Sequence, residues 1–244
     1  IFIKGIGKIN LSFLFADYSA SGNGGILPMI ITTVYMVLVA ILVATPIGIL
    51  ASVYLQEYAK QGRLVRIIRY STEALAGIPS IVYGLFGGIF FVVALKLQYS
   101  ILSGGLTVAI IILPTIIRST EEALKTVPST YREASLGLGA TKFQTLYKVI
   151  LPSAIPGILS GVILSIGRVI GESAAILLTA GTVAKMPLTV FDSARTLTVH
   201  AYLLTKETGD IQTACGVGIV LIVIVFGLNT IAKLVAKKLN KANY

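Results

Sequence analysis

The sequence predicts an all-α protein that crosses a membrane several times as a bundle of transmembrane helices. Hydrophobic residues make up 55% of its 244 positions, charged residues make up only 12%, and the mean hydropathy is +0.90. A soluble domain carries roughly a quarter charged residues, so too few are present to coat a water-facing surface. The charges also leave long gaps, and about 20 apolar residues suffice for a helix to cross a bilayer.

These gaps predict a polytopic bundle with five spans. They are expected near residues 27–55, 77–97, 101–117, 155–181 and 213–235, within one membrane domain at 25–236. Because the chain opens with Ile1 and shows no signal-peptide pattern, we expect residues 1–24 to be an outer segment that follows a missing first span. Residues 237–244 are expected to form a basic cytoplasmic tail.

The distribution of lysine and arginine predicts the orientation. Thirteen of the 20 basic residues fall in the connections at 56–76 and 118–154 and near the C-terminus, which alternation places on one side. Lys and Arg accumulate on the cytoplasmic side, so we expect the 118–154 loop and the C-terminus there, with residues 182–212 outside. The net charge of +10 then reflects membrane topology and not nucleic-acid binding.

The predicted cytoplasmic loop has the pattern of a compact helical lobe. Pro128 separates two short helix-prone stretches at 121–125 and 131–136. Gly139 can supply a turn that a residue with a Cβ resists. Thr141 is placed to cap a stretch at 142–150, which Pro152 is expected to end. Such a lobe suits docking to a soluble partner, and a solvated connector is the alternative.

One motif in this loop resembles a known family. The pattern Glu-Ala-(Ala/Ser), three residues, Gly, nine residues, an aliphatic residue, one residue, Leu-Pro is similar to the EAA loop of type-1 ABC importer permeases. The resemblance implies their fold, which usually has six spans, and a coupling helix that docks on an ATPase subunit. Val149 stands where the family usually has Ile. The matching residues are Glu133, Ala134, Ser135, Gly139, Leu151 and Pro152.

The fourth predicted span carries two charges, Arg168 and Glu172, inside the membrane. A charge at a helix centre costs at least about 2.5–3.5 kcal/mol on insertion scales. Residues four apart on a helix are neighbours, so these two are predicted to pair and to share one polar stripe with Gly161, Ser165 and Thr179. We predict that the stripe lines a solute path, since a guanidinium donates two parallel hydrogen bonds to an oxyanion. The alternative is an ion pair that only locks two helices together.

Two segments narrow the resemblance to the phosphate-specific branch of these permeases. Residues 75–86 resemble that branch's Ala-Gly-(Ile/Val)-Pro-Ser-Ile-Val-Tyr-Gly segment, and Arg168 and Glu172 resemble its Arg-(x)3-Glu. The outer loop at 192–200 looks more like the A-type subunit, with the C-type subunit as the alternative. The resemblance implies import of inorganic phosphate across the prokaryotic cytoplasmic (inner) membrane, with molybdate or sulfate as alternative substrates.

The same resemblance implies the partners. They are a second permease subunit, a dimer of ABC ATPase subunits and an extracytoplasmic phosphate-binding protein. The chain has no Gly-x4-Gly-Lys-(Ser/Thr) loop. We therefore expect it to bind no cofactor and to be no enzyme, with ATP and magnesium held by the ATPase partner.

Other classes of protein fit the sequence less well. His200 is the only histidine and falls in the predicted outer loop, so a histidine-based triad or a two-histidine metal site inside the membrane is excluded, and we expect it to be an exposed loop residue. The lone Cys215 excludes a disulfide framework. An intramembrane hydrolase and a structural or sensory membrane protein remain alternatives. Loss of hydrolysis on Ser173→Ala supports the first, and failure of an ATPase subunit to bind the 118–154 loop supports the second.

Overall fold

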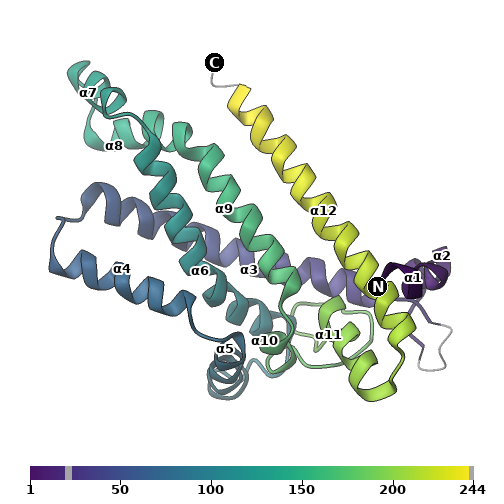
Figure 1. Ribbon diagram of the computed structural model, residues 1–244. Coiled ribbons are helices and arrows are strands. Elements are labelled where there is room, and N and C mark those ends of the chain that lie inside the picture. The colour runs from purple at the N-terminus through teal and green to yellow at the C-terminus, as the bar shows by residue number, and fades with distance from the viewer. Residues whose placement is uncertain (20–23, 242–244) are drawn as a thin grey trace.

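The computed structural model describes residues 1–19 and 24–241, and every regular element in these ranges is helical (Figure 1). Residues 242–244 of the predicted basic tail lie outside the described residues. The long helices are α3 (Leu27–Val53), α6 (Ile101–Thr126), α9 (Leu151–Gly171) and α12 (Ile211–Lys241). The shorter elements are α1 (Phe2–Gly5), η1 (Ile6–Lys8), α2 (Leu11–Phe15), η2 (Tyr54–Tyr58), α4 (Arg63–Ala76), α5 (Ser80–Gly87), η3 (Gly88–Ala94), α7 (Ser129–Gly137), α8 (Lys142–Thr145), η4 (Leu146–Ile150), α10 (Ala174–Leu177), α11 (Leu197–Leu203) and η5 (Leu204–Thr208).

Four helical stretches among the described residues are long and apolar enough to cross a membrane. A fifth candidate consists of two helical segments, Arg63–Ala76 and Ser80–Ala94, which meet at an angle of 99°. The predicted span at 77–97 corresponds to the second segment of this bent pair. The prediction of an all-α bundle of apolar spans is confirmed. The four straight candidates are Leu27–Tyr58, Ile101–Thr126, Lys142–Gly171 and Ile211–Ile231.

Small residues let α3, α6 and α9 pack closely at the centre of the bundle. A Cβ added to Gly48 of α3 would lie 2.6 Å from the Ile116 side chain of α6, and one added to Gly161 of α9 would lie 2.5 Å from the Cβ of Ser119. Such close approach allows helices in lipid to associate through van der Waals contact. The Ser52 hydroxyl also donates across the interface to the carbonyl of Ile117, at 2.8 Å.

The fourth span ends earlier than predicted. α9 ends at Gly171, and Glu172 has an extended backbone with φ −77° and ψ 132°, so the predicted helix 155–181 is wrong beyond this point. The hydroxyl of Thr198 donates to the carbonyl of Glu172 at 2.8 Å. This contact explains how the break is tolerated, because non-helical backbone at membrane depth must be satisfied within the protein.

The prediction that Pro152 ends a helix is also wrong. α8, η4 and α9 continue as one helical stretch from Lys142 to Gly171. η4 is a π-helical turn, and Pro152 lies in the first turn of α9. The proline is tolerated within this stretch because the π-helical turn before it, in which the N–H of Leu151 donates to the carbonyl of Leu146, rearranges the backbone hydrogen bonds that a proline would interrupt.

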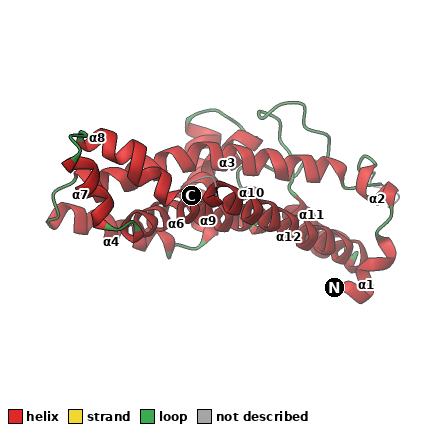
Figure 2. Ribbon diagram, turned by 90° about the horizontal axis from the view of Figure 1, so that it is seen from above, coloured by secondary structure: helices red, strands yellow, loops and turns green. Residues whose placement is uncertain are grey.

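The N-terminal helices α1 and α2 lie at the end of the bundle opposite to α7 and α8 (Figure 2). α1 packs on α12, where a Cβ added to Gly5 would lie 2.6 Å from the backbone carbon of Cys215. Phe13 of α2, Met29 of α3 and Val217 of α12 belong to one buried cluster. The described part of segment 1–24 is therefore packed onto the bundle, although this contact does not test the predicted upstream span.

Replacing Gly161 by alanine is expected to destabilise the protein by about 1–3 kcal/mol, because the new Cβ overlaps Ser119 and forces α6 and α9 apart. Gly167→Ala on the same helix is the matched control, since nothing lies within 4 Å of its Cβ position. Alanine at this control position gains helix propensity. Thermal unfolding in detergent measures both variants, and equal melting temperatures would contradict the close packing.

Candidate coupling lobe and membrane pathway

The residues between α6 and α9 fold into a small helical lobe, formed by α7 and α8, at one end of the bundle (Figure 1). Gly139 follows α7 with a φ of +85°, a conformation that residues with a Cβ rarely adopt. The Thr141 hydroxyl accepts from the Gln144 N–H at 3.2 Å, and the Gln144 side chain accepts from the Thr141 N–H at 2.9 Å. This capping box starts α8. The predicted turn at Gly139 and the predicted cap at Thr141 are both confirmed.

Apolar packing attaches the lobe to the bundle. Leu146 and Ile150, which follow α8, are buried in one cluster with Leu124 of α6 and Val53 of α3. The lobe is therefore held against the ends of two spanning helices. A displacement of the lobe is expected to reach these helices directly, because a packed interior transmits strain.

The structure divides the predicted coupling residues into two groups. The Ser135 hydroxyl lies 2.9 Å from the Thr145 hydroxyl and joins α7 to the segment that follows. Leu151 packs against the buried cluster, and Pro152 lies at the start of α9. These three residues build the lobe and its attachment. The second group is exposed on the lobe and consists of Glu133, Ala134 and Gly139.

The outer surface of the lobe carries large apolar side chains. Leu138 is 90% exposed, and Phe143 and Tyr147 are each 66% exposed, with their rings stacked at 6.3 Å. Tyr131 and Leu136 are about half exposed. Large apolar side chains exposed together on a small lobe favour contact with another molecule.

Arg168 lies in the last turn of α9 and is exposed on the surface of the chain. The predicted ion pair with Glu172 is wrong, since none of the ion pairs found in the described residues involves either side chain. The Glu172 carboxylate instead accepts from the N–H of Ala175 at 3.2 Å. The reason is the end of α9 at Gly171, because residues four apart are neighbours only on a continuous helix.

Ser165 and Thr179 are buried, and each hydroxyl donates to a carbonyl four residues earlier. Ser165 donates to Gly161 at 2.9 Å, and Thr179 donates to Ala175 at 2.6 Å. The predicted single stripe along one helix is not formed, since Thr179 comes after the break. Of the residues predicted to line the pathway, Arg168 is thus the one that places an exposed charge on the surface of α9.

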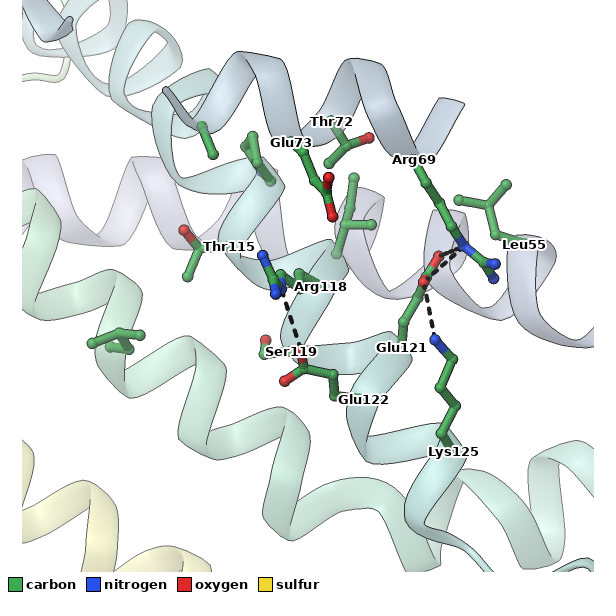
Figure 3. A pocket seen from close by; sticks show the side chains of 14 residues that line it. Leu55, Arg69, Thr72, Glu73, Thr115, Arg118, Ser119, Glu121, Glu122 and Lys125 are labelled. Atoms are coloured by element: carbon green, nitrogen blue, oxygen red, sulfur yellow. Dashed lines mark hydrogen bonds and ion pairs between the residues drawn. The ribbon is translucent and has the colours of Figure 1, made fainter. Parts of the chain in front are cut away.

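A cavity of about 800 Å³ opens between α4, α6 and α9 (Figure 3). Leu164 lines it from α9, one helical turn before Arg168, and Pro114 lines it from α6. In Figure 3, the side chains of Glu73 on α4 and Arg118 on α6 point into the space between these helices. The cavity therefore reaches α9 at Leu164, which lies on the same face of the helix as Arg168.

Ion pairs between side chains of α4 and α6 line the cavity. Arg69 of α4 lies 3.1 Å from Glu121 of α6, and Lys125 lies 3.9 Å from the same carboxylate (Figure 3). Arg118 pairs with Glu122 at 3.2 Å. Within residues 1–19 and 24–241, no group of three or more His, Cys, Asp or Glu side chains is placed to hold a metal ion. The cavity is thus lined by charges of both signs.

Tyr83 bridges the bend between α4 and α5. Its hydroxyl donates to the carbonyl of Leu75 at 2.7 Å, and its side chain is buried. Sequence reasoning used Tyr83 only as part of a resemblance. A tyrosine inside a predicted apolar span could have been noted from the sequence, because a buried tyrosine hydroxyl usually needs a hydrogen-bond partner.

The expectation that His200 is an exposed loop residue is wrong. α11 folds back onto α12 and α3, and His200 is only 2% exposed. The Tyr18 ring packs edge-on against it at 5.5 Å, and the Arg195 guanidinium lies 4.6 Å from the centre of the same ring. Burial and, to a smaller extent, the charge of Arg195 lower the pKa of His200 to about 3. The imidazole is therefore neutral at physiological pH.

The fold and the lobe motif identify a class of membrane transport protein. The family of binding-protein-dependent transport system inner membrane components matches residues 44–242, most of the chain. The protein belongs to this family and is a multi-span permease component of an ABC transporter.

Named relatives confirm the predicted resemblance. The probable ABC transporter permease protein YqgI of Bacillus subtilis (strain 168) is 36% identical over 221 residues, which cover 85% of this chain and 75% of that protein. The phosphate transport system permease protein PstA of Mycobacterium leprae (strain TN) is 36% identical over 209 residues, covering 84% and 68%. PstA of Pasteurella multocida (strain Pm70) is 37% identical over 203 residues, covering 78% and 72%.

Solved structures show the same fold. A chain of the MetNI methionine ABC transporter in inward-facing conformations has a TM-score of 0.69 and 20% identity, covering 88% of this chain and 94% of that chain. A chain of a bacterial ABC transporter that imports alginate has a TM-score of 0.69 and 15% identity, covering 87% and 79%. Together with the family match, these similarities confirm the predicted fold of type-1 ABC importer permeases.

Burial of His200 is expected to make the protein less stable as the pH falls below 6.5. The unfolded chain binds a proton at His200 below its ordinary pKa of 6.5, whereas the folded protein does not until about pH 3. Stability is therefore lost through this window, by at most about 1.4 kcal/mol per pH unit. Melting temperatures of the protein and of His200→Phe, compared between pH 7.5 and about 4.5, measure the effect. Parallel curves for the two proteins would contradict this assignment.

Proposed function

We propose that this chain is one permease subunit of an ATP-driven importer, and that the complex moves inorganic phosphate across the prokaryotic cytoplasmic membrane. The observation that carries the proposal is the similarity, over most of the chain, to proteins named phosphate transport system permease. Arg168 supports it chemically. It is an exposed cation at the end of an apolar spanning helix, and no carboxylate pairs with it among the described residues.

Arg168 recognises phosphate through two parallel hydrogen bonds from its planar guanidinium to two oxygens of the anion. Because the charge is not neutralised by Glu172, it is available to the anion. Glu172, just beyond the break, limits how tightly the anion is held. Ser165 and Thr179 shape the helices around the path, since their hydroxyls are bonded to backbone carbonyls. The cavity between α4, α6 and α9 is the exit route from Arg168.

ATP and magnesium are bound by two ABC ATPase subunits, and this chain binds no cofactor and has no enzymatic activity of its own. One ATPase subunit docks on the exposed surface of the lobe, at Glu133, Ala134 and Gly139 and the apolar side chains beside them. The lobe and the C-terminus lie on the cytoplasmic side, as the distribution of Lys and Arg favours. A second permease subunit completes the pathway, and an extracytoplasmic phosphate-binding protein docks near residues 182–212.

Replacing Arg168 by glutamine is expected to lower phosphate uptake at least about tenfold, because hydrogen bonds from a charged group contribute about 1.5–3 kcal/mol. The assay is ATP-dependent uptake of labelled phosphate into proteoliposomes that contain the assembled complex, with sulfate and molybdate as competitors. Arg63→Gln, at an exposed arginine in the first turn of α4, is the matched control and should transport normally.

Each outcome of this assay has a defined meaning. Inhibition by unlabelled phosphate alone supports the proposed substrate, whereas ATP-driven uptake of another oxyanion refutes the phosphate assignment. Normal uptake by Arg168→Gln removes Arg168 from the pathway. The absence of any ATP-driven uptake by a well-assembled complex refutes the importer function.

Gly139→Val is expected to lower both ATPase binding and ATP-driven uptake several-fold, because a β-branched residue is strained at a φ of +85° and displaces the exposed lobe surface. Gly137→Val at the end of α7 is the control, since nothing lies within 4 Å of its Cβ position and its φ is not positive. Co-purification of the ATPase subunit and uptake are measured together. Full transport by Gly139→Val would contradict the coupling role of the lobe.

A further inference from the structure

The five-residue turn η2, at the end of α3, lies between the lobe and the helices that surround the cavity. It is π-helical, with the N–H of Ala59 donating to the carbonyl of Tyr54 at 2.8 Å. π-Helical turns within α-helices are rare and occur frequently at functional sites. None of the residues of this turn belongs to the EAA motif.

Both helices of the lobe contact one residue of this turn, Glu57. The Arg132 guanidinium on α7 forms an ion pair with the Glu57 carboxylate, and the Lys142 ammonium on α8 donates to the Glu57 carbonyl. Lys142 also lies 5.0 Å from the centre of the neighbouring Tyr58 ring. The lobe is therefore attached to η2 by three polar contacts in addition to its apolar packing.

The preceding residue, Gln56, contacts α4. Its side-chain oxygen accepts from the Arg69 guanidinium of α4 at 3.4 Å, and Gln61 accepts from the same group at 3.2 Å. Arg69 in turn forms the ion pair with Glu121 of α6 at 3.1 Å. A chain of direct contacts thus runs from the lobe through η2 to α4 and α6.

The Glu57 pair differs from an ordinary surface ion pair. Its carboxylate side chain is only 11% exposed, whereas the partners in the pair Arg118–Glu122 are 69% and 64% exposed. Exposed pairs are screened by water and contribute little, while partly buried pairs are screened much less. The contact between Glu57 and Arg132 therefore resists separation when the lobe is displaced.

The far end of α4 leads to the pathway. α4 meets α5 at the 99° bend, and the hydroxyl of Tyr83 on α5 donates across it to Leu75 of α4. α5 also packs closely on α10, since a Cβ added to Gly84 would lie 2.8 Å from the Cα of Ala175, whose N–H donates to the Glu172 carboxylate at the end of α9. A shift of α4 driven from η2 consequently reaches the end of α9, where Arg168 lies.

We infer that Glu57 is a positioning residue for coupling, through which movement of the lobe reaches α4 and the pathway at Arg168. This inference rests on the proposed function, because it assigns a route for the movement that an ATPase subunit imposes on the lobe. The lobe and η2 move together, and α4 follows through Gln56 and Arg69. Glu57 itself touches neither phosphate nor ATP.

The test is the amount of phosphate transported per ATP hydrolysed by the complete complex in proteoliposomes. Glu57→Gln is expected to retain ATPase binding and ATP hydrolysis while the ratio of phosphate to ATP falls at least about fivefold, because one charged partner of a largely buried pair is removed. The exchanged pair Glu57→Arg with Arg132→Glu is expected to recover at least half of the ratio. Asp17→Asn, an exposed carboxylate in the N-terminal segment, is the charge-matched control and should keep the ratio of the unaltered chain.

A merely structural role is distinguishable from coupling. An unchanged ratio in an assembled Glu57→Gln complex overturns the inference, even if uptake and hydrolysis both fall in proportion. If Glu57→Gln does not assemble, Lys142→Gln replaces it, since Lys142 is exposed and its loss removes two of the three contacts. An unchanged ratio in that variant likewise overturns the inference. Failure of the unaltered complex to transport phosphate refutes the proposed function instead.

Discussion

Close contact among α3, α6 and α9 is the constraint on which the rest of the structure depends. Lipid offers no hydrophobic driving force between helices, so their association requires close backbone approach and good packing. Gly48 and Gly161 allow that approach on two sides of α6. Because α6 is held between its neighbours, the lobe packs against helix ends that are fixed in place. Arg69 of α4 can then pair with Glu121 of α6.

The polar side chains inside this apolar bundle include two kinds: hydroxyls that are bonded to nearby backbone carbonyls, and the charged Arg168. The hydroxyls of Thr32, Thr107, Ser165 and Thr179 all donate to carbonyls four residues earlier, so the backbone just before each residue satisfies them. Arg168 has no such partner among the described residues. Charged residues within membrane segments are costly and typically serve a solute or ion pathway. The packing of the bundle does not explain why Arg168 is exposed on the face of α9 that reaches the cavity at Leu164.

Much of the fold was predictable from local properties of the chain. The bilayer imposes a minimum length on every apolar span, so long gaps between charges located four of the five candidates well. The turn at Gly139 and the cap at Thr141 were predictable because both depend on one residue and its immediate neighbours. α4 lies in the stretch predicted only as a connection at 56–76, although its basic and apolar residues alternate with helical periodicity.

By itself, the sequence determined the class of protein, the spans and the position of the lobe, because composition and short motifs act through local geometry. Only the tertiary structure decided that α9 ends at Gly171 and that Glu172 does not pair with Arg168, since the break is held by Thr198, 26 residues further along. It also decided the burial of His200 and the pairing of Glu57 with Arg132, 75 residues apart. Such contacts depend on how distant segments meet, and no periodicity or spacing in a single chain encodes that meeting.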